Sequence, residues 1–80
     1  MSKAEKLRRA IMESRSDANI SFDDLRSFLL SLGFEERIKG GHHSFRKEGV
    51  LEKPNLQRDG NKAKGYQVRQ VRAIVIKNGL

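Results

Sequence analysis

Residues 20–34, ISFDDLRSFLLSLGF, specify a helix together with both of its ends. Ser21 is a good N-cap, and Ile20 just before it can pack on the first turn as a hydrophobic staple. Apolar residues then recur at helical spacing and give one buried stripe, formed by Phe22, Leu25, Phe28, Leu29 and Leu32. Gly33 supplies a left-handed stop. We therefore predict a helix from Phe22 to Leu32.

After this helix the pattern changes to strands. Three short extended runs follow, at residues 34–38, 42–47 and 50–53. The connections, Lys39-Gly40-Gly41 and Glu48-Gly49, are short enough to require an antiparallel meander. Pro54 ends the third run or marks it as an edge strand. Residues 55–65 are predicted to form a polar loop.

Two further helices flank this region. The first opens with a Ser2/Glu5 capping box and is expected to end near Arg15. The last covers residues 66–78, and Gly79 ends it. Its apolar face is formed by Val68, Val71 and Val75, broadened by Ile74 and Ile76.

These elements predict an α+β fold, with a three-stranded antiparallel sheet and helices on one face. Eighty residues are enough for one domain. We expect residues 1–80 to form it, with 1–19 as an N-terminal helical extension and 20–80 as the core.

The charge is strongly basic, with 17 Lys and Arg against 10 Asp and Glu and a net charge of +7. Such a surplus usually has a polyanionic partner, most often nucleic acid. Without cysteine the chain cannot form disulfides or thiolate metal sites. No stretch is apolar enough for a bilayer span or a signal peptide, so we expect a cytoplasmic protein without a membrane partner.

The candidate site is GGHHSF, residues 40–45, which contains both histidines of the chain. Histidine can accept and donate a proton near neutral pH. Strand alternation places His43 on one sheet face with Phe45, and His42 on the other. On spacing alone, His43 fits either a structural residue or an acid/base. Adjacent histidines on a strand point apart, so we predict no metal and no other cofactor.

Residues 29–34 and 37–46, followed by a closing helix that ends at Gly79-Leu80, resemble the HicA family of bacterial toxins. The resemblance covers roughly the last three quarters of the chain. It implies a double-stranded-RNA-binding-like α-β-β-β-α fold, with the N-terminal helix as an extra element. It also implies endoribonuclease activity on mRNA, that of an mRNA interferase, and neutralisation by a HicB-like antitoxin. His43 takes the position of the family's functional histidine.

The chain departs from the family pattern at two places. Most relatives carry serine at the position of Gly41, and many have a histidine after the proline, where this chain has Asn55. The first difference removes a hydroxyl that could contact the substrate, and the second removes a histidine that could assist catalysis.

Taken with this resemblance, the residues predict metal-independent cleavage of single-stranded mRNA, with His43 as general acid or base. Nine residues are expected to contact the RNA: Lys39, Gly40, Gly41, His42, Arg46, Lys47, Lys64, Arg69 and Arg72. The alternative is a non-catalytic RNA-binding module with the same fold. A DNA-binding accessory protein is less well supported, because the first two helices are separated by a connector rather than a tight turn.

Overall fold

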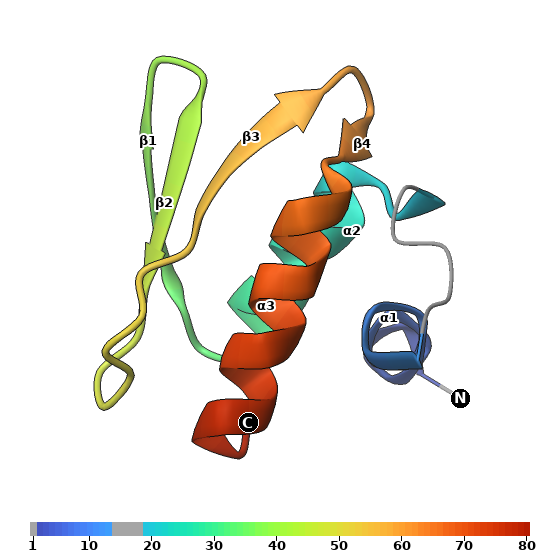
Figure 1. Ribbon diagram of the computed structural model, residues 1–80, viewed down its shortest axis with the longest axis vertical. Helices are drawn as coiled ribbons and strands as arrows, with labels where there is room; N and C mark the ends of the chain where they lie inside the picture. Colours follow the sequence, from blue (N-terminus) through green and yellow to red (C-terminus); the bar gives the residue numbers. More distant parts are fainter. Residues whose placement is uncertain (1, 14–18) are drawn as a thin grey trace.

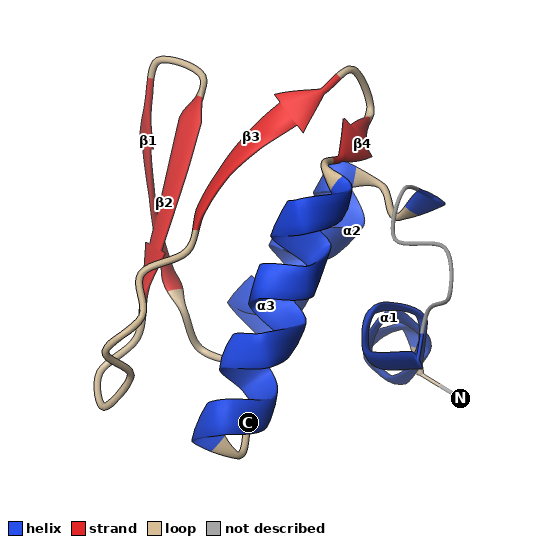
Figure 2. Cartoon of the chain, in the orientation of Figure 1, coloured by secondary structure: helices blue, strands red, loops and turns tan. Residues whose placement is uncertain are grey.

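The computed structural model describes residues 2–13 and 19–80, and this part of the chain forms three helices and one antiparallel sheet of four strands (Figure 2). In chain order the elements are α1 (Lys3–Glu13), α2 (Phe22–Ser31), β1 (Glu35–Lys39), β2 (His42–Arg46), β3 (Asn55–Asp59), β4 (Lys62–Ala63) and α3 (Gly65–Asn78). The strand order is β1-β2-β3-β4, so each strand pairs with its neighbour in sequence. The predicted α+β class is confirmed.

The helices α2 and α3 lie between the sheet and α1 (Figure 1). One hydrophobic core joins both helices to the inward side chains of the sheet, among them Phe45 and Leu56. Helix α1 packs on α2 and α3, where its Ile11 is fully buried and the Ile11 carbonyl accepts a hydrogen bond from Arg72 Nε at 2.9 Å. No described helix is long and apolar enough to span a membrane.

The ends of α2 follow the local signals in its sequence. Ser21 Oγ accepts a hydrogen bond from the Asp24 backbone N–H at 3.0 Å, as expected of an N-cap. At the other end Gly33 has φ +94°, and the Phe34 N–H donates to the Leu29 carbonyl in a Schellman cap. The predicted glycine stop is confirmed, and the helix ends one residue earlier than expected.

The third strand was predicted in the wrong place. Residues 50–53 form a loop in which the Leu51 side chain is 89% exposed, and the third strand is β3, within the segment predicted to be a loop. Gly60, with φ +62°, then turns the chain into β4, which makes the sheet four-stranded instead of three-stranded. Only Leu56 of β3 reaches the core, so this strand lacks the apolar, β-branched composition by which strands are recognised.

Helix α3 is present as predicted, with one difference on its apolar face. Ile74 is buried with the three valines, whereas Ile76 is 67% exposed and does not broaden the face. Gly79 has φ +63°, and the Leu80 N–H donates to the Val75 carbonyl, which completes the predicted glycine cap. The predicted end of the first helix at Arg15 lies outside the described residues.

One polar side chain, Gln67 of α3, is almost fully buried against the sheet. With its amide oriented to satisfy both polar groups, Nε2 donates to the Gln57 carbonyl at 3.2 Å and Oε1 accepts from the Gln57 N–H at 3.0 Å. The two-residue strand β4 pairs only with Arg58 and Asp59 of β3 and does not extend to Gln57. The Gln67 amide therefore takes the place of a neighbouring strand for the backbone N–H and C=O of Gln57. Buried backbone groups need such partners.

We expect Gln67→Leu to lower the free energy of unfolding by about 2 kcal/mol, because it leaves a buried backbone N–H and C=O without partners. Urea denaturation followed by circular dichroism measures the change. Gln70→Leu, on the exposed side of the same helix, is the matched control and should change stability by less than about 0.5 kcal/mol. Equal effects of the two substitutions would contradict this role for Gln67.

Candidate active site

The turn at Gly40-Gly41 sets the register of the β1–β2 hairpin. Gly40 has φ +60°, and the two glycines pair Lys39 with His42, and therefore Ile38 with His43. In an antiparallel pair, opposed residues point to the same face. His43 consequently lies on the helix-facing side of the sheet with Phe45, as the alternation predicted.

His43 is held by contacts from two other elements. Its Nδ1 lies 2.9 Å from Glu36 Oε2 of β1, and its ring meets the Phe22 ring of α2 edge-on, with the centroids 4.8 Å apart. The side chain retains 12% of its exposure. The other ring nitrogen, Nε2, has no protein partner in the described part of the chain. Because every buried polar side-chain atom there does have a partner, Nε2 is not buried and lies on the accessible side of the ring.

Glu36 is an ionised group held between two partners. Its Oε2 also accepts a hydrogen bond from Arg26 Nε of α2 at 2.6 Å, and its side chain is 9% exposed. The hydrogen bond from Arg26 lowers the pKa of Glu36 below its usual value; burial opposes this, and the contact with His43 adds to the lowering. A carboxylate can only accept, so Nδ1 of His43 carries the hydrogen and a neutral ring presents Nε2 as a proton acceptor.

A second cation, Arg58 of β3, lies in the same cluster. Its guanidinium carbon is 4.4 Å from the centroid of the Phe22 ring, and NH2 donates to Asp23 Oδ1 at 2.8 Å. Phe22 therefore contacts both His43 and Arg58. The Arg58 side chain is 45% exposed, so part of its charge faces solvent.

The residues predicted to bind RNA are not brought together with His43. Lys39, His42 and Arg46 alternate onto the opposite face of the sheet, which the helices leave uncovered. Gly40 and Gly41 form the tip of the hairpin, between the two faces.

The other four predicted residues lie at separate places. Lys47 follows β2 and approaches Gly33, where an added Cβ would be 2.8 Å from its Nζ. Lys64 immediately precedes α3, and Arg69 is exposed on that helix. Arg72 holds the backbone of α1, which gives its guanidinium a structural role.

Sequence reasoning missed four members of the cluster, Phe22 as a site residue and Arg26, Glu36 and Arg58 altogether. A signal for Glu36 existed, because the two-residue turn and strand alternation place it diagonally across from His43. Arg58 had no such signal, since its segment was predicted to be a loop. Arg26 could not be placed without knowing how α2 crosses the sheet.

Comparisons of the chain with protein-family models, with curated proteins and with solved structures found no match. Within the described residues, no three or more His, Asp or Glu side chains are grouped so that they could hold a metal ion. The interpretation of the cluster therefore depends on its own geometry and on the sequence.

The lowered pKa of Glu36 predicts a pH-dependent contribution to stability. Because the folded-state pKa lies below the unfolded one, ionised Glu36 stabilises the fold above the unfolded pKa of about 4.5. That contribution is lost as the pH falls through the folded-state pKa. Glu36→Gln should therefore be clearly less stable than wild type near neutral pH, with the difference shrinking as the pH falls below about 4.5.

Urea denaturation at a series of pH values between about 3 and 7 tests this prediction. Glu35→Gln is the matched control, since it removes the same charge from the neighbouring, 75% exposed position. An exposed pair contributes little to stability, so the control should keep the wild-type pH profile. The role assigned to Glu36 would be wrong if both variants gave that profile.

Proposed function

We propose that this protein is a metal-independent endoribonuclease that cleaves single-stranded RNA, with His43 as its general base. The observation that carries the proposal is the contact of Nδ1 with Glu36, which leaves Nε2 accessible as the nitrogen that accepts a proton in the neutral ring. A histidine oriented by a carboxylate in this way is suited to take a proton from a nucleophile.

The reaction that suits one histidine is attack of a ribose 2′-hydroxyl on the adjacent phosphorus. His43 Nε2 takes the hydroxyl proton as the oxygen bonds to phosphorus, and the bond from phosphorus to the 5′-oxygen breaks. The leaving oxygen takes a proton from water, and the products are a 2′,3′-cyclic phosphate and a 5′-hydroxyl. The attacking group exists in RNA and is missing from DNA.

The charges around His43 support an anionic substrate. Arg58 is partly exposed and contacts the same Phe22 ring as His43, and a guanidinium there can stabilise negative charge that develops on the phosphate. Asp23 already bonds Arg58, so the substrate would share this cation with a carboxylate. The net charge of +7 favours association with any RNA strand.

The resemblance to HicA toxins gives this activity a biological setting. We propose that the chain is the toxin of a toxin–antitoxin pair, that it acts on mRNA in the cytoplasm, and that a HicB-like protein neutralises it. The order helix, antiparallel meander, helix in residues 22–78 supports a double-stranded-RNA-binding-like core, to which α1 and the short β4 are additions.

A non-catalytic RNA-binding module remains the second candidate. Its supporting observation is the environment of His43, which is packed edge-on against Phe22 and bonded to Glu36 as a structural histidine would be. In that case substitution of His43 lowers stability or RNA affinity and there is no turnover to lose.

Incubation of labelled single-stranded RNA with purified protein in excess EDTA tests the proposal. We expect wild type to cut and His43→Gln to lose at least about 100-fold in rate, since general base catalysis is typically worth 10²- to 10⁴-fold. Glu36→Gln should lose about 10- to 100-fold, because the ring is no longer held in one tautomer. Gln70→Leu, on the exposed side of α3, is the control and should cut at the wild-type rate.

A companion substrate with a single 2′-deoxynucleotide should resist cutting at that bond, and the normal product should carry a 2′,3′-cyclic phosphate. Equal cutting by wild type and His43→Gln, with matched circular dichroism spectra, would rule out His43 as the base. RNA binding without cutting by any of the proteins would favour the binding module.

A further inference from the structure

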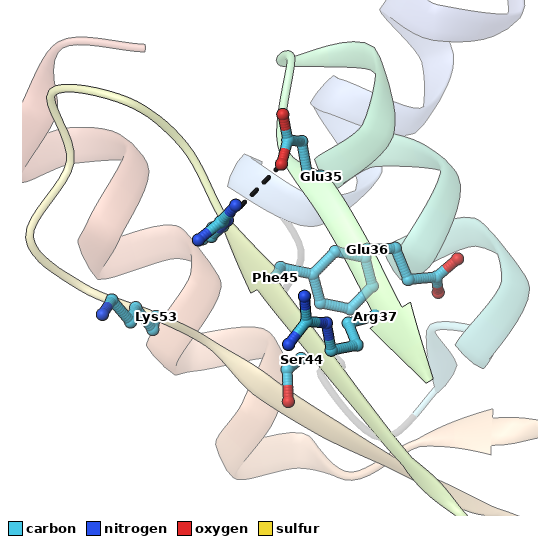
Figure 3. Close-up of a pocket in the computed structure, with 7 residues that line it drawn as sticks. Glu35, Glu36, Arg37, Ser44, Phe45 and Lys53 are labelled. Carbon is cyan, nitrogen blue, oxygen red and sulfur yellow. Dashed lines mark hydrogen bonds and ion pairs between the residues drawn. The ribbon is translucent and has the colours of Figure 1, made fainter. Parts of the chain in front are cut away.

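The outer face of the sheet, on the side away from α2 and α3, carries a pocket of about 320 Å³ beside β1 and β2. Seven residues line it: Glu35, Glu36, Arg37, Ser44, Phe45, Arg46 and Lys53 (Figure 3). The carboxylate of Glu36 points away from Arg37 and Ser44 in this view (Figure 3). Glu36 therefore borders both the pocket and the cluster around His43, but its carboxylate is directed to the cluster, and His43 does not line the pocket.

Two of the pocket's cations are unpaired. No hydrogen bond or ion pair joins the side chain of Arg37 or Lys53 to another residue in the part of the chain that the structure describes. Arg46 meets only Glu35, at 3.4 Å, and both side chains of that pair are at least 70% exposed. Three cations thus face a single weakly held carboxylate, and their charge is available to an external anion.

The fold positions these groups, although their own side chains are free. Arg37 and Ser44 are register partners on β1 and β2, which places a guanidinium and a hydroxyl side by side. The backbone at Lys53 is held in place by the residues on either side of it. Before it, Glu52 accepts hydrogen bonds from Lys77 and Asn78 of α3, and these bonds lower the pKa of Glu52 to about 2. After it, the Pro54 carbonyl accepts a hydrogen bond from the Phe45 N–H of β2 at 2.9 Å.

The pocket continues along the sheet in a way that suits a chain of phosphates. A second hollow of about 550 Å³ shares Glu35, Arg46 and Lys53 with the first and is also lined by Lys47 and Glu48. In the other direction, the Lys39 and His42 pair lies two residues further along the same face. Cations therefore recur along the outer face from Lys47 to the hairpin tip.

We propose that this groove, defined by Arg37, Ser44, Arg46 and Lys53, binds the phosphodiester backbone of single-stranded RNA at a site separate from His43. Guanidinium, ammonium and hydroxyl groups are the usual partners of backbone phosphates, and they bind without reading sequence. The identity of the strand as RNA rests on the proposed function. A strand that follows the groove to the tip at Gly40-Gly41 reaches the edge beyond which His43 lies.

Fluorescence anisotropy of a labelled 2′-O-methyl oligouridylate tests the groove without cleavage, because the probe has no free 2′-hydroxyl. We expect Arg37→Ala/Lys53→Ala to weaken binding about tenfold and to reduce the slope of log K against log salt by about 1.4, for two lost phosphate contacts. Ser44→Asp, which keeps both cations and adds a negative charge, should also weaken binding. Lys3→Ala/Lys6→Ala removes two cations from exposed α1 and should weaken it less than about twofold.

Equal losses in the two double variants would overturn the proposal, since they would indicate attraction by net charge alone. Unchanged binding in Arg37→Ala/Lys53→Ala, with matched circular dichroism, would overturn it too and would leave an acidic protein as the occupant of the groove. Failure of the ribonuclease proposal is recognised separately. In that case wild type does not cut RNA, yet the groove variants still lose affinity for the probe.

Discussion

The packing of Phe22 is the interaction on which the proposed site depends. The side chain is fully buried, its ring contacts His43 of β2 and Arg58 of β3, and its backbone N–H donates to the Asn61 carbonyl in the β3–β4 turn. One aromatic residue at the start of α2 thus fixes that helix against two strands and a turn. The position of the histidine relative to the nearby cation follows from this packing rather than from the strands alone.

Glu36 has a comparable role between α2 and the β1–β2 hairpin. A nearly buried carboxylate is costly unless it is paired, and here Arg26 and His43 both satisfy it. A hydrophobic residue at this position could hold the helix against the strand as well. A hydrophobic residue could not fix the tautomer of His43. The carboxylate therefore fits the proposed role of His43, in which Nε2 accepts a proton.

The parts of the fold that sequence reasoning recovered are those with local determinants. Ser21 and Gly33 define α2 through single hydrogen bonds and one positive φ angle, and Gly40-Gly41 determines which face His43 occupies. Strand β3 was missed because only Leu56 is buried, and its pairing is set by β2 and β4 rather than by its own composition. The partners of His43 were missed for a related reason, since Arg26 and Arg58 reach it only after distant elements pack.

The two faces of the sheet carry different kinds of polar groups. The inner face must pack on helices, so its polar groups occur as a paired and oriented cluster around His43. The outer face has no such requirement, and Arg37 and Lys53 can remain unpaired there. Basic residues predicted from sequence as one RNA site therefore belong to different surfaces. A strand bound as we propose would pass from one face to the other around the glycine turn, where a Cβ on either glycine would meet no other atom within 4 Å.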